Sequence, residues 1–132
     1  MKITADTNLL VRLITADDTR LAEIAHTVLA EAELVALPIA VLCELVWVLG
    51  RGYRIPRADI ARAIVRLCDT EKISVDRPLL AAGLAMLQGG GDFADGVIAH
   101  EGRTLGAEVF VSFDADAVKR LAAQGVKALV PQ

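Results

Sequence analysis

The chain has 132 residues, of which 55% are hydrophobic and 23% are charged, with a formal net charge of −3. This composition excludes an intrinsically disordered chain and predicts a large buried core in a single domain spanning residues 1–132. Aromatic residues make up only 4%, so the core is expected to be aliphatic. The negative net charge argues against a simple basic coat for nucleic acid.

The cysteines and the apolar segments exclude several further classes. Cys43 and Cys68 both lie in apolar segments without metal-ligand spacing, which predicts reduced, buried thiols. The longest apolar stretch, Leu34 to Cys43, is interrupted by Pro38 and is shorter than the roughly 20 residues of a membrane span. The N-terminus lacks the long apolar segment of a signal peptide. We therefore expect a cytoplasmic protein with no membrane partner.

Short strands and longer helices are predicted to alternate along the chain. Apolar residues recur at helical spacing in the longer segments, and Asp, Thr, Asn or Pro stands where most helices begin. In chain order we expect an extended segment at 2–5, a helix at 8–14, a helix starting at 17–19, a strand at 33–37, a helix from Pro38 to about Gly50, a helix at 57–68, a strand at 72–75, a helix from Pro78 to Leu87 capped by Asp76, a helix from 92–95 to Leu105, a strand at 108–112, a helix capped by Asp114 and ending at Ala123, and a strand at 127–130.

This alternation predicts an α/β fold, a three-layer α/β/α sandwich with a central, mostly parallel sheet. On the helix at 57–68, the residues expected to face the core are Ile60, Ile64, Val65 and Leu67.

Two aspartates follow predicted strands directly. Asp6 ends the first strand, and Asp114 follows the strand that contains Val109-Phe110-Val111. Because the carboxyl ends of parallel strands meet at one edge of a sheet, these two acids are candidates for a shared site. Helix capping is an alternative explanation for each of them.

Glu44 is the one charged residue in a predicted helix that is otherwise apolar almost all round. We expect its carboxylate to be largely desolvated, which is costly unless a cation, a donor or a proton compensates. The alternatives are a glutamate at a dimer seam or on the one wet stripe of the helix. The neighbouring Leu45-Val46-Trp47 is a candidate self-association surface, with core packing as the competing explanation.

A second pair of acids opens a later helix. Asp92 and Asp95 follow the flexible Gly89-Gly90-Gly91 loop and stand three residues apart, so one helical turn brings them together. Capping explains one of them but less easily both. Asp116 is either a peripheral member of the group or an acid favoured by the helix dipole.

Carboxylates gathered without matching bases repel one another, and a cluster of such hard oxygens suits Mg²⁺ or Mn²⁺. The rest of the chain is mildly basic and rich in arginine, which suits bidentate contacts with phosphate. Arg51, Arg54 and Arg57 form a basic run that either follows a phosphate backbone, lies in solvent or docks an acidic protein segment.

Four motifs in this order resemble the PIN domain, and most nearly the VapC-type toxins of bacterial toxin–antitoxin pairs. The resemblance covers essentially the whole chain. Its motifs are Asp6-Thr7-Asn8, Glu44, Asp92-Phe93-Ala94-Asp95 with Ile98-Ala99, and Ser112-Phe113-Asp114.

The resemblance implies a Mg²⁺- or Mn²⁺-dependent endoribonuclease, usually a homodimer, that a VapB-type antitoxin holds inactive. The positions that match the family's catalytic and metal-binding acids are Asp6, Glu44, Asp95 and Asp114. Asp92 matches an additional metal-binding acid of many relatives. The supporting polar positions are Thr7, Asn8 and Ser112. Arg12 matches a basic position, where RNA-phosphate contact and a solvated arginine are both open, and Gly96 stands where relatives often carry alanine.

The predicted reaction is metal-assisted hydrolysis of single-stranded RNA, whose exposed backbone can bend into a carboxylate pocket. An aspartyl-phosphate phosphatase or phosphoacceptor also places Asp at the end of a first strand. The phosphatase needs a second Asp two residues on, where this chain has Asn8, and receiver domains need a late lysine, where it has Ser112. A non-catalytic metal-binding module with the same fold is the third alternative.

Overall fold

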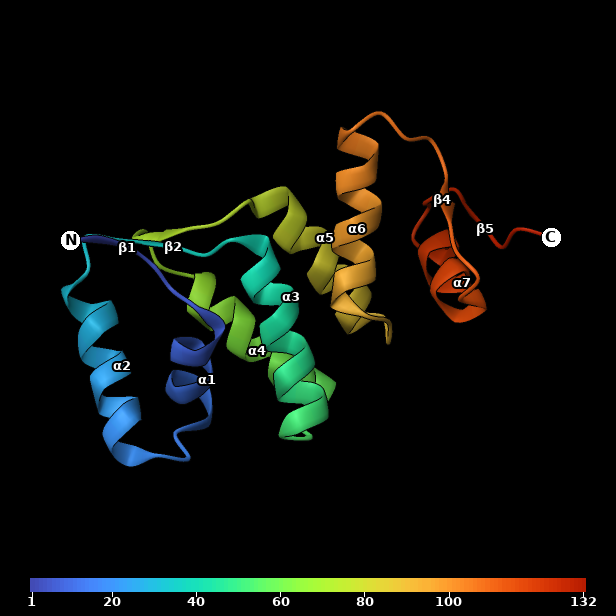
Figure 1. The fold of residues 1–132 in the computed structure, drawn as a ribbon. Helices are drawn as coiled ribbons and strands as arrows, with labels where there is room; N and C mark the ends of the chain where they lie inside the picture. The colour runs from blue at the N-terminus through green and yellow to red at the C-terminus, as the bar shows by residue number, and fades with distance from the viewer. The chain divides into compact units, whose positions relative to one another are not determined.

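The computed structural model describes residues 1–132, which divide into two compact units, Met1–Asp76 and Arg77–Gln132 (Figure 1). Each unit has its own parallel sheet. The predicted α/β class with parallel strand pairing is confirmed. The five strands are divided between two sheets, three in one and two in the other. The single domain expected over 1–132 stays a prediction.

The amino-terminal unit is built on a three-stranded parallel sheet in the order β1-β2-β3, where β1 is Lys2–Thr4, β2 is Leu34–Ala36 and β3 is Ile73–Ser74. Parallel neighbours require crossover connections, and helices supply them here. Figure 1 shows α1, α2 and α4 on one side of these strands. The helices of the unit are α1 (Thr7–Thr15), α2 (Thr19–Glu31), α3 (Ile39–Trp47), the π-helix η1 (Val48–Gly52) and α4 (Arg57–Cys68).

Two helices of this unit begin at the same edge of its sheet. The backbone N–H of Ala5 donates to the carbonyl of Ala36, which continues the pairing of β1 and β2 to the end of both strands. Asp6 then stands before α1, and Pro38 before α3, where its fixed φ favours the start of a helix. The carboxyl ends of β1 and β2 therefore lead directly into α1 and α3, which pack against each other.

The core of the amino-terminal unit is aliphatic, as predicted. Leu10, Val35 and Leu42 are fully buried, and α4 adds Ile60 and Ile64 to the core. The expected inner position of Val65 is wrong, because its side chain is 46% exposed. The buried residues of α4 follow the four-residue spacing of Ile60 and Ile64, and one further residue turns the side chain away from that face.

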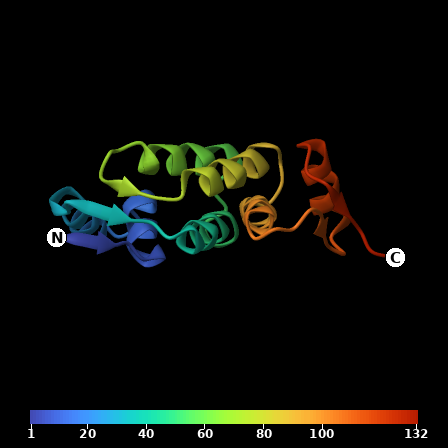
Figure 2. The ribbon, with the colours of Figure 1, turned by 90° about the horizontal axis from the view of Figure 1, so that it is seen from above.

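The carboxy-terminal unit combines three helices with a two-stranded parallel sheet, drawn from yellow to red in Figure 2. Its elements are α5 (Arg77–Gln88), α6 (Phe93–Thr104), β4 (Phe110–Val111), α7 (Ala115–Ala123) and β5 (Ala128–Leu129). The strand expected at 108–112 is thus shorter, because only its last part has a partner strand. None of the helices in either unit combines the length and the hydrophobicity needed to cross a bilayer.

Two glycines allow α5 and α6 to approach closely. A Cβ on Gly83 would lie 2.6 Å from the ring of Phe93, and a Cβ on Gly96 would lie 2.4 Å from the carbonyl oxygen of Ala82. An alanine in place of Gly96 would therefore push the two helices apart. A cluster of Met86, Ala99 and Leu121 joins α5 and α6 to α7.

Candidate active site

Asp6 stands at the carboxyl end of β1 and precedes α1, but its carboxylate makes no capping hydrogen bond to the helix. Its side chain is exposed and accepts a hydrogen bond from Nδ2 of Asn8, with 3.4 Å between Nδ2 and Oδ2. The capping explanation therefore does not apply to Asp6. The contact with Asn8 agrees with the supporting position predicted for that residue.

Thr7 follows Asp6 and is the one buried polar residue of the protein, with 3% of its surface exposed. Its Oγ1 is buried and makes no hydrogen bond. An unpartnered buried hydroxyl costs about 1–3 kcal/mol. Thr7 is next to Asp6, the first candidate metal ligand. A polar molecule bound there could form a hydrogen bond with Oγ1 of Thr7 and so remove this cost.

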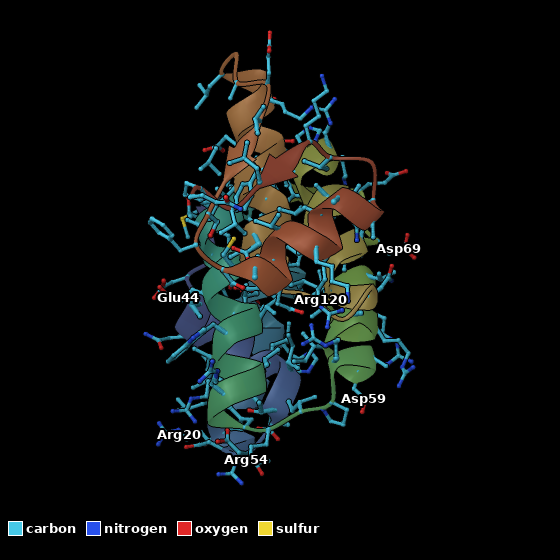
Figure 3. The ribbon with its side chains drawn as sticks, turned by 90° about the vertical axis from the view of Figure 1, so that its right-hand side faces the viewer. Arg20, Glu44, Arg54, Asp59, Asp69 and Arg120 are labelled. Atoms are coloured by element: carbon cyan, nitrogen blue, oxygen red, sulfur yellow. The ribbon has the colours of Figure 1, made fainter.

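Glu44 lies on α3 and is exposed, so the expected desolvation of its carboxylate is wrong. The buried residues of this helix, Leu42, Leu45 and Val46, occupy one side only. Glu44 and Trp47 lie away from that side, and Trp47 is 63% exposed. The apolar sequence around Glu44 misled the prediction because the helix is packed on one side, not all round. Figure 3 shows the Glu44 side chain pointing away from α3.

Arg12 is held by an acid of the same unit. Its Nη1 lies 3.1 Å from Oδ1 of Asp17. The hydroxyl of Thr15 donates to the same Oδ1, and the hydroxyl of Tyr53 donates to Oδ2. The hydrogen bonds from Thr15, Tyr53 and Arg12, with the charge of Arg12, lower the pKa of Asp17. The network joins the loop after α1 to the loop after η1. Contact of Arg12 with an RNA phosphate stays a prediction, and such contact would compete with Asp17.

Two aspartates of the carboxy-terminal unit cap helices, as the alternative explanation proposed. Oδ1 of Asp92 accepts from the backbone N–H of Ala94, and Oδ1 of Asp114 accepts from that of Ala117, each at 3.1 Å. In each carboxylate these bonds engage Oδ1 and leave Oδ2 for another partner. Ser112 Oγ accepts from the backbone N–H of Asp114 at 3.0 Å, which fits its predicted supporting position.

Asp95 differs from both capping residues because it lies inside the first turn of α6 and is partly buried. Burial raises the pKa of its carboxyl, and the negative charges of Asp92 and Asp114 raise it further. The three acids of this unit are therefore within electrostatic reach of one another, and their role in a common site stays a prediction. Asp116 is paired with a base, since Nε of Arg120 donates to its Oδ2 at 2.8 Å.

Arg120 holds the loop that precedes Asp92, a role that the sequence analysis missed. Its Nη1 donates to the carbonyl of Gly89 at 2.9 Å. Gly90 has a φ of +93°, and a Cβ there would lie 2.6 Å from Nη1 of Arg120. A side chain at Gly90 would therefore meet both an unfavourable backbone conformation and the guanidinium of Arg120. The only feature of the sequence that could have drawn attention to Arg120 is its four-residue spacing from Asp116 on one helix.

The donor sets of both units fit a divalent metal ion. Carboxylate oxygens are the ligands that Mg²⁺ and Mn²⁺ prefer, and the repulsion felt by Asp95 is of the kind that a cation removes. Neither unit by itself places three such side chains around a common point. Asp6 and Glu44 belong to one unit and Asp95 and Asp114 to the other, so their convergence in one pocket stays a prediction.

Comparison with known proteins identifies the family. The sequence matches the PIN domain over residues 3–124, a range that contains every candidate acid. The chain belongs to the PIN domain family. PIN domains are commonly nucleases and generally use divalent metal ions. No curated protein matches the chain.

Proposed function

We propose that this PIN domain is a metal-dependent endoribonuclease of the VapC toxin type. The observation that carries the proposal is the group of like charges around Asp95, whose pKa is raised by burial and by Asp92 and Asp114. Capping accounts for Asp92 and Asp114 but not for Asp95, which lies near both of their charges. A bound cation would offset this repulsion.

Asp6, Glu44, Asp95 and Asp114 would hold Mg²⁺ or Mn²⁺, with Asp92 as an additional ligand. When bound, the metal would activate water and neutralise charge on the phosphodiester.

The chain's own polar groups then fix these ligands. Asn8 donates to the carboxylate of Asp6, which restrains its rotation. Ser112 fixes the backbone of Asp114 through its N–H. Capping restrains Asp92 and Asp114 by one oxygen each and leaves the other free.

RNA cleavage by the purified protein tests this proposal. We expect cleavage of single-stranded RNA with Mn²⁺ or Mg²⁺, none in EDTA, and at least a hundredfold loss in Asp6→Asn and Asp95→Asn, about what one lost charge stabilisation costs. Asp69→Asn, an exposed acid at the end of α4, is the matched control and should cleave like the wild type. Cleavage in EDTA, or full activity in both variants, would exclude a metal-dependent nuclease that uses these acids. An acyl phosphate on Asp6 would instead identify the phosphatase class, and metal binding without any cleavage the non-catalytic module.

The remaining parts of the proposal are a VapB-type antitoxin, a homodimer and a cytoplasmic location, all of which rest on the resemblance to VapC-type toxins. A small protein encoded next to this chain should copurify with it and abolish the cleavage. Sedimentation should give twice the mass of the chain. An active chain that sediments as a monomer and has no such neighbour would be a PIN nuclease of another kind.

A further inference from the structure

One face of α3 and η1 carries three exposed side chains of different chemistry in a row. Glu44 and Trp47 are three residues apart, and Arg51 follows four residues after Trp47. Residues at these spacings lie on the same face of a helix, about one turn of 5.4 Å from each other. The π turn of η1 keeps Arg51 near this line. π turns of this kind are frequent at functional sites.

Trp47 is exposed in a way that packing does not explain. Its side chain is 63% exposed, and it is the only large hydrophobic residue of α3 and η1 that is exposed. Leu45, Val46 and Leu49 are buried on the other side, so they fix the helix that presents the indole. A lone indole framed by charged residues is a poor core for a protein interface, which needs a contiguous apolar patch.

Two arginines follow Trp47 along the chain. Arg51 and Arg54 are both exposed and have no carboxylate partner. Arg54 has a φ of +54°, a left-handed conformation that costs a residue other than glycine some free energy. The hydrogen bond from Tyr53 Oη to Asp17 Oδ2, at 3.0 Å, fixes the loop that holds this arginine. Figure 3 shows Arg54 at one end of the amino-terminal unit, well away from Glu44.

We propose that Glu44, Trp47, Arg51 and Arg54 form a track for single-stranded RNA, on which a base stacks against Trp47 and phosphates contact the two arginines. This inference rests on the proposed function, because Glu44 is the end of the track at which cleavage would occur. Aromatic rings stack unpaired bases, and guanidinium groups bind the backbone. Double-stranded RNA has no free base face for the indole, so the track discriminates between the two forms.

Trp47 is the only tryptophan of the chain, so its fluorescence reports on this surface alone. The probe is a short single-stranded oligoadenylate, titrated into the full-length protein in EDTA so that no cleavage occurs. We expect quenching of the indole emission by this oligonucleotide, and much less by a duplex of the same length. Trp47→Ala should weaken binding about tenfold, measured by anisotropy of labelled RNA, while Trp47→Phe retains most of the affinity.

The arginines and the glutamate of the track should affect RNA binding in opposite directions. Arg51→Gln and Arg54→Gln should each reduce the slope of log affinity against log salt by about 0.7, the loss of one phosphate contact. Glu44→Gln should strengthen binding in EDTA, since it removes a negative charge from the path of the RNA. Arg66→Gln, which removes an equal charge from an exposed position in the last turn of α4, is the control and should leave the affinity nearly unchanged.

Three results of the RNA titrations would overturn the track: RNA binding without quenching, equal quenching by duplex, or unchanged affinity in Trp47→Ala. A blue shift of the emission that follows protein concentration and a doubling of mass would assign this face to a second copy of the chain, which also overturns it. Cleavage with Mn²⁺, measured separately, distinguishes the two proposals. If the wild type cleaves but the variants bind normally, only the track fails. If RNA quenches Trp47 but is never cleaved, only the nuclease fails.

Discussion

The candidate acids of the two units are held in different ways. In the amino-terminal unit Asp6 and Glu44 are exposed, and the Asp6 side chain caps no helix. In the carboxy-terminal unit Asp92 and Asp114 each cap a helix, and Asp95 is partly buried between their charges. The two acids of the amino-terminal unit therefore contribute little to its stability, whereas the three acids of the carboxy-terminal unit affect the stability of that unit. Variants of the second group should change both metal binding and folding.

The largest expected effect on stability comes from Gly96, whose position sets the α5–α6 contact that carries Asp92 and Asp95. Gly96→Ala places a Cβ against the carbonyl of Ala82 and should lower the free energy of unfolding by about 1–3 kcal/mol. Gly102→Ala on the same helix has its nearest atom at 4.0 Å and should stabilise by up to about 1 kcal/mol. Urea denaturation of both variants measures the difference. Equal changes in the free energy of unfolding for the two variants would mean that the close approach of α5 and α6 does not contribute to stability.

The next effect concerns the loop before Asp92. Arg120→Gln loses the bonds to Gly89 and Asp116 and should destabilise the protein by about 1 kcal/mol. If Arg120 positions the acids, this variant should also bind Mn²⁺ more weakly, although it removes a positive charge near them. Calorimetric titration with Mn²⁺ measures this affinity. Arg103→Gln removes the same charge from an exposed position of α6 and is the control. Tighter Mn²⁺ binding in Arg120→Gln would show that its charge, not its bonds, governs the site.

The sequence predicted where the acids of the carboxy-terminal unit lie on their helices, because that placement follows from local rules, whereas their role in a site stays a prediction. Asp92 and Asp114 precede helices, and Asp95 lies one turn after Asp92. It predicted the environment of Glu44 wrongly, because burial depends on which elements pack around a helix and not on its own residues. The clamp of Arg120 on Gly89 and the bond from Tyr53 to Asp17 join segments 31 and 36 residues apart. No local pattern encodes such contacts.

A smaller effect on stability is expected for Asp95→Asn, which should stabilise the protein, unlike Gly96→Ala and Arg120→Gln. The raised pKa of Asp95 means that the folded state favours the protonated carboxyl. The metal-free protein should therefore lose stability as the pH rises from the ordinary value of 3.8 through the higher pKa of the folded state. Asp95→Asn has no such charge and should melt at a higher temperature than the wild type at neutral pH in EDTA. Mn²⁺ should stabilise the wild type much more than the variant, and a lower melting temperature of metal-free Asp95→Asn would contradict the repulsion.

The smallest effect belongs to the amino-terminal unit and has the reverse dependence on pH. Hydrogen bonds from Thr15 and Tyr53 lead the contacts that lower the pKa of Asp17, so its folded state favours the ionised carboxyl. The stability from this network is present above the ordinary pKa of 3.8 and is lost as the pH falls through the lower pKa of the folded state. Tyr53→Phe should lower the melting temperature slightly at neutral pH, and this difference should vanish in acid. Because Asp17 is exposed, salt should weaken the effect. A difference that persists at low pH would mean that the tyrosine ring, and not its hydroxyl, holds the loop of Arg54 in place.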